Sequence, residues 1–514
     1  MRAIDMLDHG LRREPQRDCL RDETRAYSHE EVRLLTHRIA HALRAQGLNR
    51  GAKVAFYSAN CALTFVAMIA VFRAGCVWQP VHPRNTVAEN LDFLLDNETE
   101  YLFYHSKTAA DAAQFKAAVK SLKGLTCVDT ADENGPGLEE WAAPFADVFP
   151  DDMHGPDDLA WVKATGGTTG RSKSVEITHR AVVALFSAFH WNMPLNAGHV
   201  TLAATPLTHA AGNVALCTLC NGGTIVFLDK ADPAAILDTI ERHRITTLFM
   251  PPTVIYNLLG TPGVRERDFS SLRYFLYTAA PISADRMREA LEVFGPVMAQ
   301  GWGLAEAPLL CTFLGPDDYK RAAAEPKILS SCGRATAFAR VEIVGEDGRV
   351  MPDGEVGELV VKSDLVMRGY LNRPEENTKA LHDGALYTGD VGYRDSEGFY
   401  FIVDRNKDMI ISGGFNIYPS EIEQLLWRHP AVLDCAVIGV PDAKWGEAVK
   451  AVVELKQGQS VTEEELRLYC RDALAAFKAP KTVEIWPELP KSLLGKVLKR
   501  EIRERYWQGE TRRV

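Results

Sequence analysis

A glycine- and threonine-rich segment at residues 165–174, with the sequence TGGTTGRSKS, constrains this chain more than any other feature. Its glycines leave backbone amides uncovered and permit positive φ angles. Its threonines add hydroxyl donors, and Arg171 and Lys173 add positive charge. Because amide and hydroxyl dipoles beside a cation can replace the hydration shell of an anion, the segment favours binding of a polyphosphate. It lacks the Gly-Lys-Ser/Thr ending of a Walker A loop, and a polar surface turn is the alternative interpretation.

Strand and helix patterns alternate around this segment and through about the first 400 residues, which is typical of α/β layering. The patterns predict strands at 54–57, 159–162, 224–228 and 247–250, and helices at 63–74, 234–243 and from 181 onward. Between residues 341 and 361, the turn sequences EDG and PDG separate short strands. These turns predict a small antiparallel unit.

The chain changes character again after residues 404–408. There we expect a helix at 419–428, strands at 435–439 and 451–454, and a helix at 462–474. Thr462 and Glu465 are spaced as a capping box at the start of that last helix. A segment of this size, about 110 residues, suffices for a separate α+β domain.

The composition is that of an ordinary globular protein, with 514 residues, 46% hydrophobic and 25% charged. A net charge of -10 argues against nucleic acid as a partner. The longest apolar run, residues 63–76, is interrupted by Arg73 and predicts a buried helix rather than a transmembrane segment. Asp5 interrupts what would be a signal peptide, so the cytoplasm is expected. The ten cysteines are scattered, and the lone pair Cys217 and Cys220 lies in an apolar run that predicts core packing.

Five further motifs accompany the phosphate segment in a fixed order along the chain. They are TPLTH at 205–209, QGWGLAE at 300–306, YTGD at 387–390, DRNKDMIISGGFNIYPSEIE at 404–423 and PKSLLGK at 490–496. Together they resemble the motifs of the adenylate-forming superfamily, which comprises acyl-CoA synthetases, carrier-loading adenylation domains and luciferases. The resemblance runs almost end to end. It implies residues 1–405 as two stacked α/β subdomains plus a small β-barrel-like unit, residues 406–514 as a mobile α+β domain, and an active site in the cleft between them.

The reaction implied by the resemblance has two halves. A carboxylate attacks the α-phosphorus of ATP and releases pyrophosphate, and a thiol such as that of CoA then displaces AMP. Because the first half brings two anions together, it needs charge neutralisation and alignment. The resemblance assigns Glu306 to Mg²⁺, Lys496 to the charge that develops in the transition state, and Lys407 to the hinge between domains. Without the motifs, Glu306 would be a helix-start acid and Lys496 part of a solvated basic face.

The nucleotide set follows from the same motifs. Asp390 is expected to accept both ribose hydroxyls, with Arg405 on the other side, although an Asx turn is an alternative role for Asp390. Trp302 stands where tyrosine is usual, and its indole is expected to stack on adenine. The implied ATP- and AMP-binding residues are Thr165, Gly166, Gly167, Thr168, Thr169, Gly170, Lys173, Ala279, Ala280, Pro281, Gly301, Trp302, Gly303, Leu304, Ala305, Asp390 and Arg405.

Some positions depart from the family pattern. Ser172 and Ser174 replace the usual Pro and Gly, and Ala279 and Ala280 lie in a segment that is usually glycine-rich. Ala305 replaces a threonine whose hydroxyl contacts the α-phosphate. Losing a hydrogen bond to a charged group costs about 1.5–3 kcal/mol unless water replaces it. Either a neighbouring group substitutes, or adenylation is slower than is typical of the family.

The acyl pocket is expected, by analogy, to be mostly apolar and aromatic. Its implied lining is Phe186, Phe189, His190, Trp191, His209, Ala210, Ala211, Gly212, Leu309 and Leu310. No arginine or lysine belongs to this set, which disfavours a second carboxylate, and no aspartate is placed to hold an amino group. A fatty, alicyclic or aromatic monocarboxylic acid is therefore expected. The histidines have an alternative role as hydrogen-bonded core residues.

Candidates for CoA contacts lie in the C-terminal part, with surface packing as the alternative. They are Gly413, Gly414, Phe415, Trp445, Phe477 and Lys478. Three functions remain open at this point: an acyl-CoA synthetase using ATP, Mg²⁺ and CoA, an enzyme that loads a carrier protein, and a nucleotide-binding protein with degenerate activity. A homodimer is a further expectation.

Overall fold

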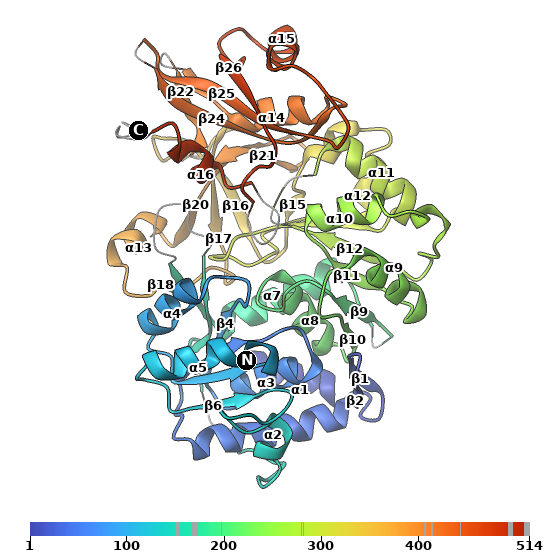
Figure 1. The fold of residues 1–514 in the computed structure, drawn as a ribbon, viewed down its shortest axis with the longest axis vertical. Helices are drawn as coiled ribbons and strands as arrows, with labels where there is room; N and C mark the ends of the chain where they lie inside the picture. The colour runs from blue at the N-terminus through green and yellow to red at the C-terminus, as the bar shows by residue number, and fades with distance from the viewer. Residues whose placement is uncertain are drawn as a thin grey trace.

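The computed structural model describes residues 1–150, 154–165, 173–196, 198–278, 280, 282–405, 408–412, 415–442, 444–491 and 497–507. Within these ranges the chain forms four sheets, two large ones in the N-terminal part, which share the chain between them, and two small ones toward the C-terminus (Figure 1). The fold class predicted from the sequence is confirmed: a large α/β part, a small antiparallel unit and a smaller α+β part.

Two sheets form the large N-terminal part. The seven-stranded sheet has the order β18 (Gly369–Tyr370), β8 (Ser174–Thr178), β7 (Leu159–Ala164), β4 (Val77–Val81), β3 (Lys53–Tyr57), β5 (Tyr101–Tyr104) and β6 (Gly124–Cys127). The nine-stranded sheet has the order β15 (Arg334–Ala335), β14 (Thr312–Leu314), β13 (Met298–Trp302), β12 (Tyr274–Tyr277), β11 (Thr247–Phe249), β9 (Val200–Ala203), β10 (Thr224–Phe227), β1 (Asp18–Arg21) and β2 (Ala26–Ser28). Most neighbours are parallel, as strand–helix alternation requires.

A layer of helices lies between the two sheets and carries the largest core. Its members are α1 (Ala3–Leu11), α2 (His29–Ala45), α3 (Ala62–Arg73), α7 (His179–Asn192) and α8 (Ala210–Cys220). Helix α3 is apolar on all sides and is buried along its whole length except at Leu63, as the sequence predicts for a helix inside a layered domain. Cys217 and Cys220 belong to this core, and all ten cysteines are free thiols.

The outer faces of the sheets are covered by two further sets of helices. On the seven-stranded sheet these are α4 (Val87–Asp96) and α5 (Ala109–Ala118). On the nine-stranded sheet they are α9 (Pro233–Arg242), α10 (Pro252–Leu259), α11 (Ala284–Phe294) and α12 (Pro316–Arg321). The arrangement therefore has five layers, in which each sheet is covered on both faces.

Two small sheets follow. The first contains β16 (Arg340–Val344), β17 (Gly357–Lys362), β20 (Ala385–Arg394), β19 (Leu381–His382) and, paired with β20, β21 (Tyr400–Arg405). The second contains β23 (Phe415–Ile417), β22 (Ile410–Ser412), β25 (Gly446–Leu455), β24 (Val432–Asp442) and, paired with β25, β26 (Thr482–Trp486). Helices α14 (Pro419–Trp427), α15 (Glu463–Ala473) and α16 (Lys499–Glu504) accompany the second sheet. The capping box of Thr462 and Glu465 at the start of α15 is confirmed.

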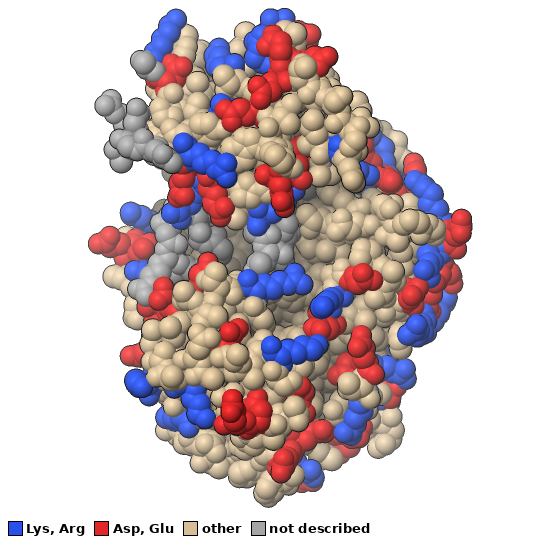
Figure 2. All heavy atoms as spheres, in the orientation of Figure 1, with Lys and Arg blue, Asp and Glu red and all other residues tan. Residues whose placement is uncertain are grey.

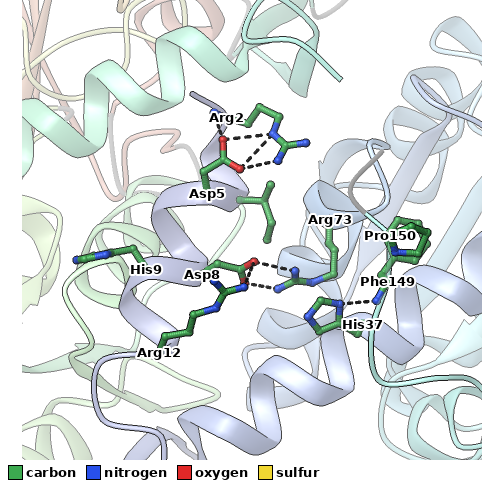
Figure 3. Close-up of a pocket in the computed structure, with 10 residues that line it drawn as sticks. Arg2, Asp5, Asp8, His9, Arg12, His37, Arg73, Phe149 and Pro150 are labelled. Carbon is green, nitrogen blue, oxygen red and sulfur yellow. Dashed lines mark hydrogen bonds and ion pairs between the residues drawn. The ribbon is translucent and has the colours of Figure 1, made fainter. Parts of the chain in front are cut away.

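A cavity of about 510 Å³ lies among α1, α2 and α3, far in the sequence from every motif (Figure 3). Its charged groups pair with each other: Arg2 with Asp5 at 2.6 Å, and Arg73 with Asp8. Burial, together with the charge of Arg73, lowers the pKa of His37 to about 4, and its Nδ1 accepts a hydrogen bond from the backbone of Phe149. The polar groups that line the cavity thus pair with one another, and these pairs join the N-terminal helices.

Removing one partner of the Asp8–Arg73 pair should destabilise this region. The Arg73 side chain is only 6% exposed, and an unpaired buried charge typically costs 3–5 kcal/mol. We expect Asp8→Ala to lower the free energy of unfolding by about 3 kcal/mol in urea denaturation. Asp157→Ala breaks an exposed pair with Arg180 and should cost less than about 1 kcal/mol. Equal effects of the two substitutions would contradict a buried role for Asp8.

Candidate active site

Asp390 is the centre of a buried polar cluster that joins the nine-stranded sheet to the first small sheet. It lies in β20 directly opposite Arg405 of β21, and its side chain is 4% exposed. The Trp302 Nε1–H, at the end of β13, donates to Asp390 Oδ2 at 3.0 Å. Arg405 Nε lies 2.8 Å from the other oxygen. Each carboxylate oxygen has a second lone pair, so Asp390 is held in place while it keeps capacity for further donors.

The indole of Trp302 therefore has a role that the sequence did not predict. Stacking on adenine stays a prediction, and the structure adds that the indole N–H donates to Asp390. The ring itself is 6% exposed and packs in the inner core. A tyrosine at this position would have its hydroxyl in another place, so the hydrogen bond to Asp390 depends on the indole.

Glu306 follows β13 in a tight turn and lies at a second point of the site. Its Oε1 accepts a hydrogen bond from the Tyr370 hydroxyl at 2.7 Å, and its carbonyl accepts from the Met367 backbone. Burial, with the charge of Glu306, raises the pKa of Tyr370. The Lys173 ammonium lies 4.6 Å from the centre of the Tyr370 ring. The structure thus brings Glu306 together with the end of the phosphate segment, through a tyrosine in β18 that no motif had indicated.

The phosphate segment joins two antiparallel strands. Thr165 N donates to Lys173 O at 2.8 Å, and Ala164 lies opposite Ser174. The predicted strand and helix are confirmed as β7 and α7, but β8 comes between the segment and the helix. Ser174 Oγ accepts from the buried Asn97 Nδ2 at 2.9 Å. This hydroxyl therefore serves the core, which explains why serine is accommodated where glycine is usual.

Gly301 and Gly303 allow the turn that carries Glu306 to pack closely against the backbone of Leu309. A Cβ on Gly301 would lie 2.5 Å from the Leu309 carbonyl oxygen, and one on Gly303 would lie 2.5 Å from the Leu309 nitrogen. Leu309 itself has a φ of 68°. Both glycines are thus required by close backbone approach, which fixes the turn that carries Glu306.

The predicted acyl residues described next lie in two places, at the start of α8 and on the buried face of α7. His209 and Ala211 lie at the start of α8, and burial, with added charge from His82 and Lys163, lowers the pKa of His209 to about 3. Phe186 and Phe189 are fully buried core residues, and a Cβ on Gly212 would lie 2.0 Å from the Leu207 carbonyl oxygen.

Two positions depart from the expectation for this set. Trp191 is 70% exposed at the end of α7, which does not fit the lining of an enclosed pocket. In addition, Lys163 approaches the set from β7, with its Nζ 3.1 Å from Asn213 Oδ1 in α8. The predicted set itself contains no lysine, but the tertiary fold brings Lys163 next to α8.

The C-terminal candidates are partly brought together. Phe415 and Phe477 are 56% and 40% exposed, and their ring centres lie 4.9 Å apart. Trp445 is 42% exposed in the turn between β24 and β25. Lys478 pairs with Glu421 at 2.7 Å. An exposed aromatic pair beside an anchored cation suits a flexible, partly apolar ligand.

Ion pairs connect the hinge motif to the C-terminal lysine motif. Lys499 pairs with Glu423 at 2.8 Å and Arg503 with Asp408 at 2.8 Å, while Lys491 pairs with Glu454 at 2.7 Å. Three of the basic residues around position 496 are thus engaged by acids rather than forming a solvated basic face. The remaining candidates Gly166, Gly167, Thr168, Thr169, Gly170, Ala279, Pro281, Lys407, Gly413, Gly414 and Lys496 lie outside the described residues.

The surface in Figure 2 is hollowed between the C-terminal part at the top and the rest of the molecule, and Lys and Arg side chains lie along this hollow. Among the described residues no group of three or more His, Cys, Asp or Glu side chains gathers as a metal site. Glu306 alone suits Mg²⁺, which typically uses one or two carboxylates together with substrate phosphates.

Comparison with known protein families matches two models to this chain. Residues 7–371 match the AMP-binding enzyme model, and residues 421–496 match the AMP-binding enzyme C-terminal domain. The chain belongs to the AMP-binding enzyme family. The resemblance derived from the six motifs is confirmed.

Relatives of this AMP-binding enzyme include CoA ligases of different acids. It is 36% identical to the feruloyl-CoA synthase of an Amycolatopsis species, over 96% of this chain and 97% of that protein. It is 41% identical to the medium/long-chain-fatty-acid–CoA ligase FadD8 of Mycobacterium tuberculosis over 70% of this chain, and the match spans 63% of that relative, less than two thirds of its length. The crystal structure of ATP-bound MatB from Rhodopseudomonas palustris superposes with a TM-score of 0.90 at 30% identity, covering 98% of this chain and 99% of that one.

None of the helices of this AMP-binding enzyme that fall in the described ranges has the length and apolar character needed to cross a membrane. The buried helix predicted at 63–74 is α3, in the middle layer.

Proposed function

We propose that this protein is an AMP-forming acid–CoA ligase whose substrate is a largely apolar monocarboxylic acid: fatty, alicyclic or aromatic. The observation that carries the proposal is the buried Asp390 carboxylate, held by Trp302 and Arg405 next to the turn that presents Glu306. A carboxylate fixed by two donors keeps lone pairs that can accept the two hydroxyls of a ribose. The activities named for the relatives, on fatty acids and on ferulate, support a CoA ligase.

In the first half-reaction, Asp390 accepts hydrogen bonds from the ribose hydroxyls of ATP and fixes the nucleotide. Mg²⁺ on Glu306 would supply positive charge that offsets the repulsion between phosphate and the attacking carboxylate. Tyr370 keeps Glu306 oriented through its hydroxyl. Lys496 stabilises the charge that develops as the carboxylate oxygen bonds to the α-phosphorus and pyrophosphate leaves.

In the second half-reaction, the C-terminal domain (residues 406–514) rotates about Lys407 relative to residues 1–405. This motion withdraws Lys496 and opens a path for a thiol. The thiol attacks the acyl carbonyl, and AMP leaves with the bonding electrons. The exposed pair Phe415 and Phe477 offers an apolar contact for the pantetheine arm. A cytoplasmic location and a homodimer complete the proposal, supported only by the sequence composition and the resemblance.

The test is pyrophosphate release with Mg-ATP, with and without CoA, across short fatty, long fatty, alicyclic, aryl and dicarboxylic acids. We expect a strong apolar substrate that needs CoA for turnover. Release that does not depend on CoA would indicate a carrier-protein acceptor instead. Absence of release with every acid would contradict the proposal and favour a nucleotide-binding protein.

Ala305 supplies a further prediction, because its methyl group stands where the family places a hydroxyl. Ala305→Thr should preserve adenylation or raise it by about tenfold to a hundredfold, the value of one hydrogen bond to a charged group. Ala305→Val adds the same volume without the hydroxyl and should give no gain. The measurement is the rate of pyrophosphate release at saturating acid. A severe loss in Ala305→Thr would show that the phosphate site is rearranged around Ala305.

A further inference from the structure

Lys163 occupies an unusual position between the two N-terminal sheets. It lies near the end of β7, two residues before the phosphate segment. Its ammonium is 4.4 Å from the centre of the Trp161 ring and 4.7 Å from that of Trp78. Both rings are 1% exposed, whereas Lys163 keeps partial access to solvent. The ammonium therefore lies among buried rings, while part of the residue stays accessible.

The ammonium lacks an acidic partner. No carboxylate within the described residues lies in ion-pair range of Lys163, and burial lowers its pKa to about 7. The two indole rings offset part of the cost of burying a cation. Of its three N–H donors, Asn213 Oδ1 accepts one at 3.1 Å. The indole N–H of Trp78 also has no hydrogen-bond acceptor among the described residues. Donors are thus in excess of acceptors here.

This group borders the predicted acyl pocket. Asn213 directly follows Ala211 and Gly212 in the first turns of α8. The charge of Lys163 contributes to the lowered pKa of His209, whose ring centre lies 5.4 Å from that of His82. The imidazoles are buried and largely neutral at pH 7, so they provide no negative charge for Lys163. An acceptor oxygen on a bound ligand can replace solvent at the remaining donors of Lys163.

We propose that Lys163 is a specificity-determining residue that donates a hydrogen bond to an oxygen atom on the acyl group, remote from the carboxylate that is activated. The proposal rests on the proposed function, and it narrows the substrate class. The acid would be a largely apolar monocarboxylic acid that carries a carbonyl or a hydroxyl oxygen. A site built to bind a substrate oxygen discriminates strongly against the analogue that lacks it, because the buried donor is then left unpaired.

A purely structural role is the competing explanation. The contacts of Lys163 with Trp161 and Asn213 also hold β7 against α8. Removal of these contacts would make the acyl pocket less rigid and would weaken binding of every acid. The two explanations differ in the selectivity they predict. Loss of a structural contact lowers activity on all acids alike, whereas loss of a hydrogen bond to a remote oxygen lowers activity only on the acids that have such an oxygen.

The experiment compares Lys163→Met with the wild type on two matched pairs: hexanoate with 5-oxohexanoate, and 3-phenylpropanoate with 3-(4-hydroxyphenyl)propanoate. We expect the wild type to prefer the oxygenated acid in at least one pair by tenfold or more in kcat/KM. Lys163→Met should lose that preference through a higher KM, while its activity on the plain acid changes less than threefold. Lys163→Arg should keep part of the preference. Which pair responds identifies the kind of oxygen.

Lys53→Met, on strand β3 of the same sheet, is the matched control and should behave as the wild type. Equal loss on both members of each pair in Lys163→Met, or no preference in the wild type, would overturn the proposal. Calorimetric binding of the same pairs is measured in parallel with thermal unfolding of each variant. If no acid supports pyrophosphate release, the proposed function fails. The calorimetric binding of the matched pairs then decides separately whether Lys163 recognises an oxygen. Equal binding of both members of each pair would overturn the proposal for Lys163.

Discussion

Lys496→Ala is expected to abolish acyl-adenylate formation while leaving the transfer of a preformed acyl-adenylate to CoA largely intact. A positioned cation that stabilises developing charge is commonly worth about 3 kcal/mol or more, a loss of at least about a hundredfold. In the second half-reaction, the thiol displaces AMP while the C-terminal domain is in a different position. Lys496 has no role in that step. Pyrophosphate release measures the first half, and thioester formation from synthetic acyl-adenylate measures the second.

Two neighbouring lysines serve as controls for this prediction. Lys456→Ala removes a partly exposed lysine of the same domain, whose ammonium donates to the Pro430 carbonyl oxygen, and should leave both half-reactions unchanged. Lys491→Ala removes an ion pair with Glu454 and should lower stability rather than act on one half-reaction. Equal loss of both half-reactions in Lys496→Ala would refute the assignment of separate domain positions to the two steps.

The order of the motifs and the layering were predictable from the sequence because each rests on local signals. The apolar run at 63–74 could only be a buried helix, and α3 is buried in the middle layer. Thr462 and Glu465 stand at capping-box spacing, and α15 begins there. The turns after residue 341 predicted the antiparallel unit, which contains β16, β17 and β20. In each case, residues close in sequence determine the outcome.

The contacts that shape the site were not predictable, because they join residues far apart in the chain. Tyr370 reaches Glu306 across 64 positions, and Trp302 reaches Asp390 across 88. Lys163 meets Asn213 across 50 positions, and its burial depends on two tryptophans from different strands. A family motif names the residue that touches the substrate, but the residue that holds it in place comes from the tertiary fold.

Asp390→Asn is expected to raise the KM for ATP by about a hundredfold with a smaller effect on the KM for the acid. The amide keeps the shape of the carboxylate but has one acceptor oxygen, so it cannot accept both ribose hydroxyls while bonded to Trp302 and Arg405. Hydrogen bonds to a charged group contribute about 1.5–3 kcal/mol. Arg405 would also lose its only ion-pair partner among the described residues, in a cluster where Asp390 is 4% exposed.

Trp302→Phe tests how far the orientation of Asp390 matters. It removes a single N–H donor at 3.0 Å and leaves an apolar ring, so the KM for ATP should rise by about tenfold, less than in Asp390→Asn. Asp353→Asn is the control, because it breaks an exposed ion pair with Arg394, which lies in β20 together with Asp390. It should change the KM for ATP by less than about twofold. Steady-state kinetics with ATP varied at saturating acid give all three values. If Asp390→Asn acted mainly on the acid instead, Asp390 would have to be assigned to acyl recognition, and the cluster with Trp302 and Arg405 would no longer indicate where the nucleotide binds.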